Sequence, residues 1–366
     1  MTKLDHEREA SAWSGTELVR PPLEITLDGR QRAELLATLD SLRSSGLGIV
    51  DVEPGHVRLP SLAADIARID TEVRDGSGFA LVHGFPVEGL TVPEIELAYW
   101  ALCTQLGTGV TQNSDAGFIH YVTDGELRPQ QGKRGVGNPG PTPLHVDLSD
   151  CVSLLCVRQA RDDPPSWLAS STYVYHEVAR RRPDLAELLH RGFEWDRLEE
   201  HRPGEDPSSG YLVPLFSEVD GKVSCRYNRY WMAAAAKRSG RRWPAEVIEL
   251  LDLVDELAHA HRLEVAFQPG DIQFVNNYTV LHGRAEHVHE PDEAAKRLLL
   301  RIWLDFEPAR PVVDPAIVRY GVIRHGLLGY SAADIRRGAH LRERVRRPDG
   351  ATVVGTSEPE ARGKET

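Results

Sequence analysis

The carboxyl-terminal half of the chain contains short β-like segments separated by tight turns, and this pattern restricts the possible folds most. The segments cover residues 263–267, 272–275, 280–282 and 298–304, with Gln268-Pro269-Gly270-Asp271 as the first turn. Further strands are expected at residues 77–85, 152–157 and 167–172. Many short strands joined by tight turns are typical of a jelly roll.

Several segments with helical periodicity precede these strands or lie between them. Residues 31–45 place Leu35, Leu36, Leu39 and Leu42 on one stripe, as in an amphipathic helix. Further helices are expected at residues 62–74, 92–106, 175–191 and 244–260. We therefore expect an α+β fold with a double-stranded β-helix (jelly roll) core that is flanked by helices.

A chain of 366 residues can bury a large core, and we expect one catalytic domain at residues 21–340. Residues 1–20 resemble a loose arm, and the tail at 341–366 has the composition of a disordered segment. Residues 107–143 are polar and rich in Gly, Pro, Asn and Gln, which is typical of an active-site lid.

Composition excludes several classes of function. The 43 basic and 55 acidic residues give a formal charge of -12, which argues against nucleic acid as a partner. The four cysteines show no C-x-x-C spacing, so reduced, buried thiols are expected. The chain has neither an apolar run of membrane-spanning length nor a signal-peptide core, so we expect a cytoplasmic protein without membrane contact.

The segment His145-Val146-Asp147 sets an imidazole and a carboxylate two residues apart. In an extended strand both side chains point to the same face and could bind one metal ion. A third ligand candidate is His282, which ends an apolar run and precedes Gly283; the alternative is a hydrogen-bonded core histidine. Two histidines and one carboxylate are the ligand set of non-haem Fe(II) sites with open positions, and zinc accepts the same set.

Two arginines follow in the last predicted strand, at Arg297 and Arg301. Strand alternation places them on one face, about 13 Å apart, together with Leu299 and Trp303. If that face lines a pocket, the guanidinium groups are suited to bind carboxylates. If it faces solvent, they are edge-strand charges that prevent aggregation.

The order of these motifs resembles the Fe(II)/2-oxoglutarate-dependent oxygenases of the taurine dioxygenase and clavaminate synthase type. The shared order is H-x-D, a long insertion, Pro-Gly-Asp, His-Gly-Arg and two arginines four residues apart. The resemblance extends over residues 78–305, and the combination is more specific than any single motif.

The resemblance implies a role for individual residues. His145, Asp147 and His282 would be the iron ligands, and Arg297 would bind the distal carboxylate of 2-oxoglutarate with help from Ser166. Arg301 would reach the substrate or support the cosubstrate. Further substrate contacts would come from Gln112, Asn113, Arg226 and Tyr227.

The sequence departs from the family pattern at two places. Pro164-Pro165 stands where a Gly-Gly pair commonly precedes the hydroxyl residue, which puts the position of Ser166 in doubt. His287 stands where an aromatic residue commonly follows, which changes one wall of the expected pocket.

The implied reaction uses Fe(II), 2-oxoglutarate and O2 and releases succinate and CO2. Asp147 favours hydroxylation over halogenation, because the halogenases of the family lack this carboxylate; desaturation, ring closure and epoxidation stay open. The expected substrate is a small anionic metabolite or natural-product intermediate. The alternatives from other classes are a non-catalytic metal-binding jelly roll and a zinc hydrolase, and neither needs two arginines that bind a diacid.

Overall fold

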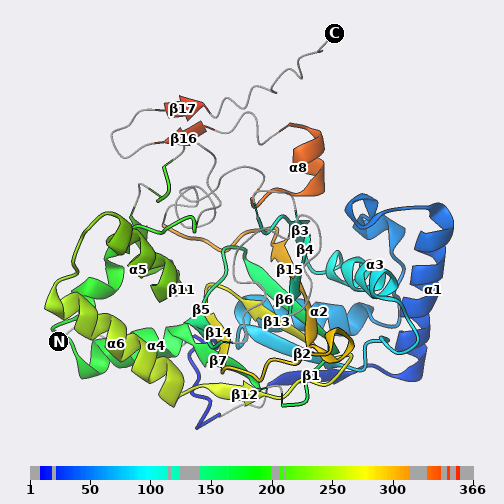
Figure 1. Ribbon diagram of the computed structural model, residues 1–366, viewed down its shortest axis with the longest axis horizontal. Coiled ribbons are helices and arrows are strands. Elements are labelled where there is room, and N and C mark those ends of the chain that lie inside the picture. The colour runs from blue at the N-terminus through cyan, green and yellow to red at the C-terminus, as the bar shows by residue number, and fades with distance from the viewer. Residues whose placement is uncertain are drawn as a thin grey trace.

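Two β-sheets form the centre of the structure, and helices cover their outer sides (Figure 1). The computed structural model describes residues 9–18, 22–113, 117–123, 140–162, 164–198, 206–209, 212–313, 328–338, 344–346 and 352–354. None of the helices in these ranges combines the length and the apolar character needed to cross a bilayer.

The major sheet has the strand order β1-β2-β13-β6-β15-β3, and β4 also pairs with β15. The minor sheet has the order β12-β7-β14-β5. Strands close in sequence therefore alternate between the sheets, as in a jelly roll. The major strands are β1 (Leu23–Thr26), β2 (Phe79–His83), β3 (Thr108–Val110), β4 (Ile119–Val122), β6 (Cys151–Arg158), β13 (Ile272–Asn276) and β15 (Leu298–Asp305); the minor strands are β5 (Thr142–His145), β7 (Ser166–Ser170), β12 (Leu263–Val265) and β14 (Val280–Arg284).

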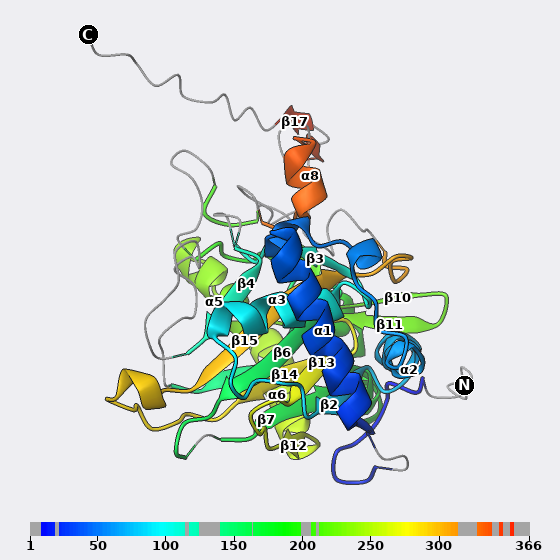
Figure 2. The same ribbon diagram turned by 90° about the vertical axis from the view of Figure 1, so that its right-hand side faces the viewer.

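The helices form two groups on opposite sides of the sheets. Helices α1 (Gly29–Ser45), α2 (Ala63–Asp75) and α3 (Val92–Cys103) lie beside the major sheet, and α1 and α3 face the viewer in Figure 2. Helices α4 (Ser171–Arg181) and α6 (Ala245–Ala260) lie against the minor sheet, with α5 (Arg229–Arg238) nearby. The expected α+β jelly roll is thus confirmed.

Shorter elements complete the described chain. Two antiparallel strand pairs, β8 (Gly192–Phe193) with β9 (Val213–Pro214) and β10 (Phe216–Val219) with β11 (Lys222–Cys225), precede α5 and were not expected from the sequence. The expected helix at 175–191 ends early because Pro183 follows α4, and a 3₁₀ turn replaces its second part. The remaining elements are η1 (Ile49–Asp51), η2 (Pro54–His56), η3 (Ala186–His190), β8 (Gly192–Phe193), β9 (Val213–Pro214), β10 (Phe216–Val219), β11 (Lys222–Cys225), η4 (Glu293–Ala295), α8 (Ala332–Arg336), β16 (Arg344–Arg346) and β17 (Thr352–Val354).

Strand β15 separates two hydrophobic cores. Its residues Leu298, Leu300, Ile302 and Leu304 pack with the helices of the α1–α3 group. Trp303 belongs to the second core, which lies between the sheets and under α4 and α6. This confirms the predicted alternation, so Arg301 and Trp303 share the face that looks between the sheets. The four cysteines are buried free thiols, as expected.

The prediction of a loose amino-terminal arm is wrong for the described residues 9–18. Trp13 donates from Nε1 to the Ser77 carbonyl at 2.7 Å and packs against the Phe79 ring at a centroid distance of 5.2 Å. The Gly15 amide donates to the His261 carbonyl. Trp13 therefore holds this polar segment on the core through ring packing and a hydrogen bond from its indole nitrogen. The composition of the segment did not indicate this contact.

The expected lid at 107–143 begins and ends as sheet. Strands β3 and β4 pair with β15, and β5 pairs with β14, so these parts are ordered by ladder hydrogen bonds, and the lid role of the segment stays a prediction. Residues 114–116 and 124–139 lie outside the described residues. Most of the expected tail at 341–366 also lies outside them, except that β16 and β17 form a hairpin.

Close pairing of β5 with β14 requires a residue without a side chain at position 283. A Cβ atom on Gly283 would lie 2.6 Å from the Thr142 carbonyl oxygen and 3.1 Å from the Leu144 amide nitrogen. Both are backbone atoms that cannot turn aside, so any larger residue must push the strands apart.

We expect Gly283→Ala to lower the free energy of unfolding by about 1–3 kcal/mol, the usual cost of overpacking. Thermal or urea unfolding measures this change. Gly55→Ala is the matched control, because a Cβ atom at Gly55 meets nothing within 4 Å. Equal stability of the two variants would contradict the close approach of β5 and β14.

Candidate metal centre

His145, Asp147 and His282 converge on one point, although His282 lies far along the chain. One ligand atom from each residue lies within 4.8 Å of the other two. Among the described residues, no other group of three His, Cys, Asp or Glu side chains has this geometry. The predicted third ligand is therefore in place next to the H-x-D motif.

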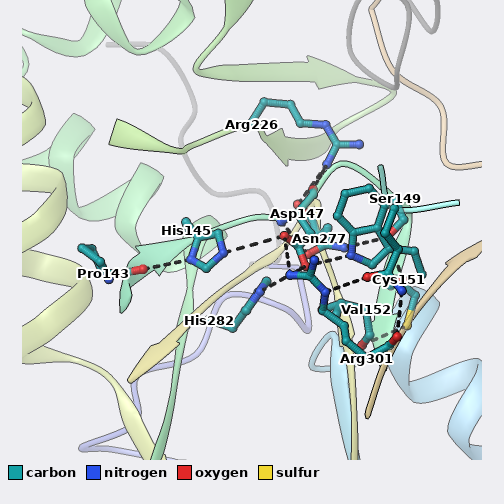
Figure 3. Close-up of polar contacts among 12 residues, drawn as sticks. Pro143, His145, Asp147, Ser149, Cys151, Val152, Arg226, Asn277, His282 and Arg301 are labelled. Atoms are coloured by element: carbon teal, nitrogen blue, oxygen red, sulfur yellow. Dashed lines mark hydrogen bonds and ion pairs between the residues drawn. The ribbon is translucent and has the colours of Figure 1, made fainter. Parts of the chain in front are cut away.

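The two histidines are direct neighbours across the minor sheet. His282 of β14 pairs with His145 at the end of β5, and their ring centroids are 4.5 Å apart. The Nδ1 atom of His145 contacts the Pro143 carbonyl at 2.9 Å (Figure 3). Because a carbonyl only accepts, Nδ1 carries the proton and the Nε2 lone pair is left for a ligand.

The Asp147 carboxylate lies close to the Nε2 atoms of both rings. Its Oδ1 is 3.8 Å from His145 Nε2, and its Oδ2 is 3.6 Å from His282 Nε2. Oδ2 also accepts a hydrogen bond from Trp303 Nε1 at 2.9 Å and lies 3.2 Å from Arg301 Nη1. Oδ1 has fewer protein donors and is the oxygen better placed to bind a cation.

The charges around the site favour the ligand forms of two groups. Burial alone would raise the pKa of Asp147, but the Arg301 charge and contacts with both histidines outweigh it and hold the pKa well below its usual range. Burial, and then the charge of His145, lowers the pKa of His282. An ionised carboxylate beside a neutral imidazole is the state that metal binding requires.

A second group of side chains holds the backbone that carries Asp147. The Arg226 guanidinium donates to the carbonyls of Asp147 and Asn277 at 3.3 Å and lies 3.9 Å above the Tyr278 ring. The Asp147 amide donates to Asn277 Oδ1 at 3.0 Å (Figure 3). Each of these contacts restricts the movement of the carboxylate relative to β14.

Gln112 acts on the Asp147 carboxylate indirectly, because it holds the Arg301 side chain that contacts this carboxylate. Its Oε1 accepts from Arg301 Nε at 2.7 Å, and its Nε2 donates to the Arg301 carbonyl at 2.7 Å. Arg301 is thereby held in the orientation that places Nη1 on Asp147. Gln112 acts on Arg301 in this structure, and its expected contact with substrate stays a prediction.

Arg226 and Tyr227 make supporting contacts within the protein, and their expected substrate contacts stay predictions. Arg226 is 2% exposed and bonded to backbone carbonyls. Tyr227 is fully buried, and its hydroxyl donates to Asp255 of α6. Asn113 is also buried, and its Oδ1 accepts from the Gly117 amide at 3.1 Å. The substrate role of Asn113 stays a prediction.

Arg297 and Ser166 lie at the starts of their strands. Arg297 is 4% exposed and directly precedes β15. Ser166 begins β7 and pairs with Arg284 of β14, so it lies two residues before Leu168, the partner of His282. The Pro164-Pro165 pair therefore leaves Ser166 within the minor sheet. The carboxylate-binding roles of Arg297 and Ser166 stay predictions.

Sequence reasoning missed two contributors to the site. Strand alternation predicts an inward Trp303 but not its hydrogen bond to Asp147, and no sequence pattern indicates the contact of Asn277 with the Asp147 amide. The inward position of Trp303 close to Arg301 was the sequence feature that could have indicated its contact with Asp147. The contact of Asn277 depends on a turn after β13 that the sequence pattern does not specify.

Comparison with known proteins gives this geometry a family. Residues 44–303 match the family model "Taurine catabolism dioxygenase TauD, TfdA family". The chain is 30% identical over 292 residues to FR-33289 synthase of Streptomyces rubellomurinus, covering 78% of this chain and 85% of that protein. It is 27% identical over 312 residues to the taurine hydroxylase-like protein SAT17 of Stachybotrys chartarum, covering 81% of this chain and 80% of SAT17.

Solved structures share the fold at lower identity. Asparagine oxygenase in complex with Fe(II), 2S,3S-3-hydroxyasparagine and succinate superposes with a TM-score of 0.61 at 15% identity, covering 77% of this chain and 93% of that chain. The oxygenase OrfP in complex with Fe and alpha-ketoglutaric acid gives a TM-score of 0.56 at 14% identity, covering 78% and 94%. With its His-Asp-His triad, the chain belongs to the TauD/TfdA family of Fe(II)/2-oxoglutarate-dependent oxygenases.

Proposed function

We propose that His145, Asp147 and His282 hold Fe(II) in an enzyme that hydroxylates a small anionic metabolite or natural-product intermediate. The observation that carries this proposal is the meeting of the three ligand atoms within 4.8 Å of one another. The proton on His145 Nδ1 and the ionised Asp147 also suit a divalent cation. The residues present therefore fit the metal that the family uses.

In this proposal the protein supplies three ligands and leaves the remaining positions open. When bound, iron with 2-oxoglutarate and O2 supplies oxidation of a substrate C–H bond to C–OH, with succinate and CO2 as the other products. Trp303 donates to Oδ2 and Arg301 Nη1 lies closer to Oδ2 (3.2 Å) than to Oδ1 (3.5 Å), so Oδ1 is the oxygen of Asp147 that would bind the metal. Such one-oxygen binding keeps the open positions free.

Arg297 and Ser166 bind the distal carboxylate of 2-oxoglutarate in this proposal. Arg297 is buried, and it lies four residues before Arg301, an even spacing that puts both on one face of an extended segment. A guanidinium can bind a carboxylate through two parallel charge-assisted hydrogen bonds. Ser166 is the first residue of β7 in the minor sheet. Its hydroxyl supplies the distal carboxylate with an uncharged hydrogen-bond donor.

The substrate is proposed to be small and anionic. Asparagine oxygenase was solved with 3-hydroxyasparagine, and OrfP with (3S)-hydroxy-L-Arg, so relatives of this fold act on small molecules that carry a carboxylate. Arg301 is the cation nearest the triad and offers the substrate anion a partner next to Asp147. Desaturation, ring closure and epoxidation use the same residues and differ in the position of the substrate radical.

Oxygen-dependent release of succinate tests the proposed reaction. Anaerobic protein with Fe(II) and 2-oxoglutarate is expected to show a visible charge-transfer band and, after O2 is added with candidate substrates, to form succinate. Mass spectrometry of the substrates detects the added oxygen atom. Asp147→Ala is expected to reduce succinate release at least about a hundredfold, since even outer-shell changes cost 10–100-fold.

The surface variant Asp184→Ala, which loses only a pair with Arg182, is the control. Absence of both the charge-transfer band and oxygen-dependent succinate from the unaltered protein would refute the oxygenase proposal. That result would favour the zinc hydrolase or the non-catalytic module.

Arg297→Leu is expected to raise the Kd for 2-oxoglutarate about 10- to 100-fold, because a charge-assisted hydrogen-bond pair is lost. Anaerobic calorimetry with the Co(II)-loaded protein measures this affinity, and metal affinity should be unchanged. Arg158→Leu removes a guanidinium at the same end of the neighbouring strand, where Arg158 pairs with Leu298. An equal effect of both variants would show that only overall charge matters.

Trp303→Phe is expected to weaken Co(II) binding about tenfold, because Asp147 Oδ2 loses the donor that orients the carboxylate. Trp100→Phe makes the same change in size on the other side of the major sheet. Trp100 Nε1 has no hydrogen-bond partner among the described residues, so metal affinity should stay unchanged in this control. A tenfold loss in both variants would count against the orienting role.

A further inference from the structure

Gln273, in the centre of β13, is fully buried with an unsatisfied amide. It is 0% exposed, and within the part of the chain that the structure describes neither Nε2 nor Oε1 has a hydrogen-bond partner. An amide removed from water without partners costs free energy. A group of this kind in a native fold indicates a ligand or a water molecule that completes its hydrogen bonds.

The side chain of Gln273 faces the space between the two sheets. Its strand neighbours Ile272 and Phe274 pack with the α1–α3 helices, whereas Val275 belongs to the core between the sheets. Alternation along β13 therefore puts Gln273 on the same side as Val275. This is also the side on which Arg301 and Trp303 approach Asp147.

Gln273 and Arg301 lie on one row across the major sheet. Gln273 pairs with Leu154 of β6, and Leu154 pairs with Arg301 of β15. Two strand spacings separate the outer members by about 10 Å. Leu154 is only partly buried although it lies in the middle of the sheet, so the row that joins the Gln273 amide to the Arg301 guanidinium reaches accessible surface at its middle residue.

This row starts at Arg301, which contacts the metal centre. Asp147 contacts β15 at Arg301 and Trp303, and Arg297 lies farther along the same segment, beyond Arg301. A diacid that extends from the triad toward Arg297 starts at the Arg301 end of this row, on the face of the major sheet that Leu154 and Gln273 share. Gln273 is a polar group on that row that no other described residue satisfies.

We propose that Gln273 is a binding residue for 2-oxoglutarate, whose amide Nε2 donates a hydrogen bond to an oxygen atom of the cosubstrate above Leu154. A water molecule beside the ligand supplies the donor for Oε1. This inference rests on the proposed function of the same site, and it adds a residue of β13 to the carboxylate-binding residues of β15 and β7.

The test compares Gln273→Met with the unaltered protein, because methionine keeps the length of the side chain and removes both polar atoms. Anaerobic calorimetry of the Co(II)-loaded protein gives the Kd for 2-oxoglutarate, and thermal unfolding without 2-oxoglutarate gives Tm. We expect the Kd to rise about tenfold, the effect of one hydrogen bond to a charged group. Tm should be unchanged or higher, since an unpaired buried amide is removed.

Phe274→Leu is the matched control, because Phe274 is buried on the same strand and faces the helices. It should lower Tm and leave the Kd for 2-oxoglutarate unchanged. An unchanged Kd in Gln273→Met, or an equal rise of Kd in both variants, would overturn the inference. If the unaltered protein itself does not bind 2-oxoglutarate, the proposed function fails, which is a different result from failure of Gln273 alone.

Discussion

The pairing of β5 with β14 is the constraint on which the rest of the site depends. It sets His145 beside His282, and it requires the close backbone approach that Gly283 permits. The two histidines come from strands that are far apart in sequence, so only a closed sheet brings them together. Asp147 then follows from the chain, because it lies two residues after His145 and just beyond the end of β5.

The carboxylate of Asp147 connects the two sheets electrostatically. Histidines of the minor sheet lie on one side of it, and Trp303 and Arg301 of the major sheet lie on the other. Arg226 and Asn277 hold the backbone of Asp147 through hydrogen bonds to its carbonyl and its amide. Because these donors are buried, each has more effect on Asp147 than it would in water, and together they hold the pKa of the carboxyl well below its usual range and fix its orientation.

Periodicity predicted the regular elements well where the pattern was long. The inward face of β15 and the helix from Gly29 are examples, since alternation and helical stripes depend only on local sequence. The sequence pattern did not predict the structure of segments that are ordered by tertiary contacts. Trp13 anchors a polar arm that composition marks as loose, and β3 and β4 turn part of a polar segment into sheet by pairing with β15.

The sequence by itself determined the ligand types, their order and the family, because residue identity and spacing are properties of the chain alone. Only the tertiary structure decided how these groups meet. Gln112 orients Arg301, Arg226 supports a backbone turn, and Gln273 faces the interior with an unsatisfied amide. The physical reason is that a hydrogen bond has a partner and a direction, and partners from different strands become neighbours only when the two sheets close.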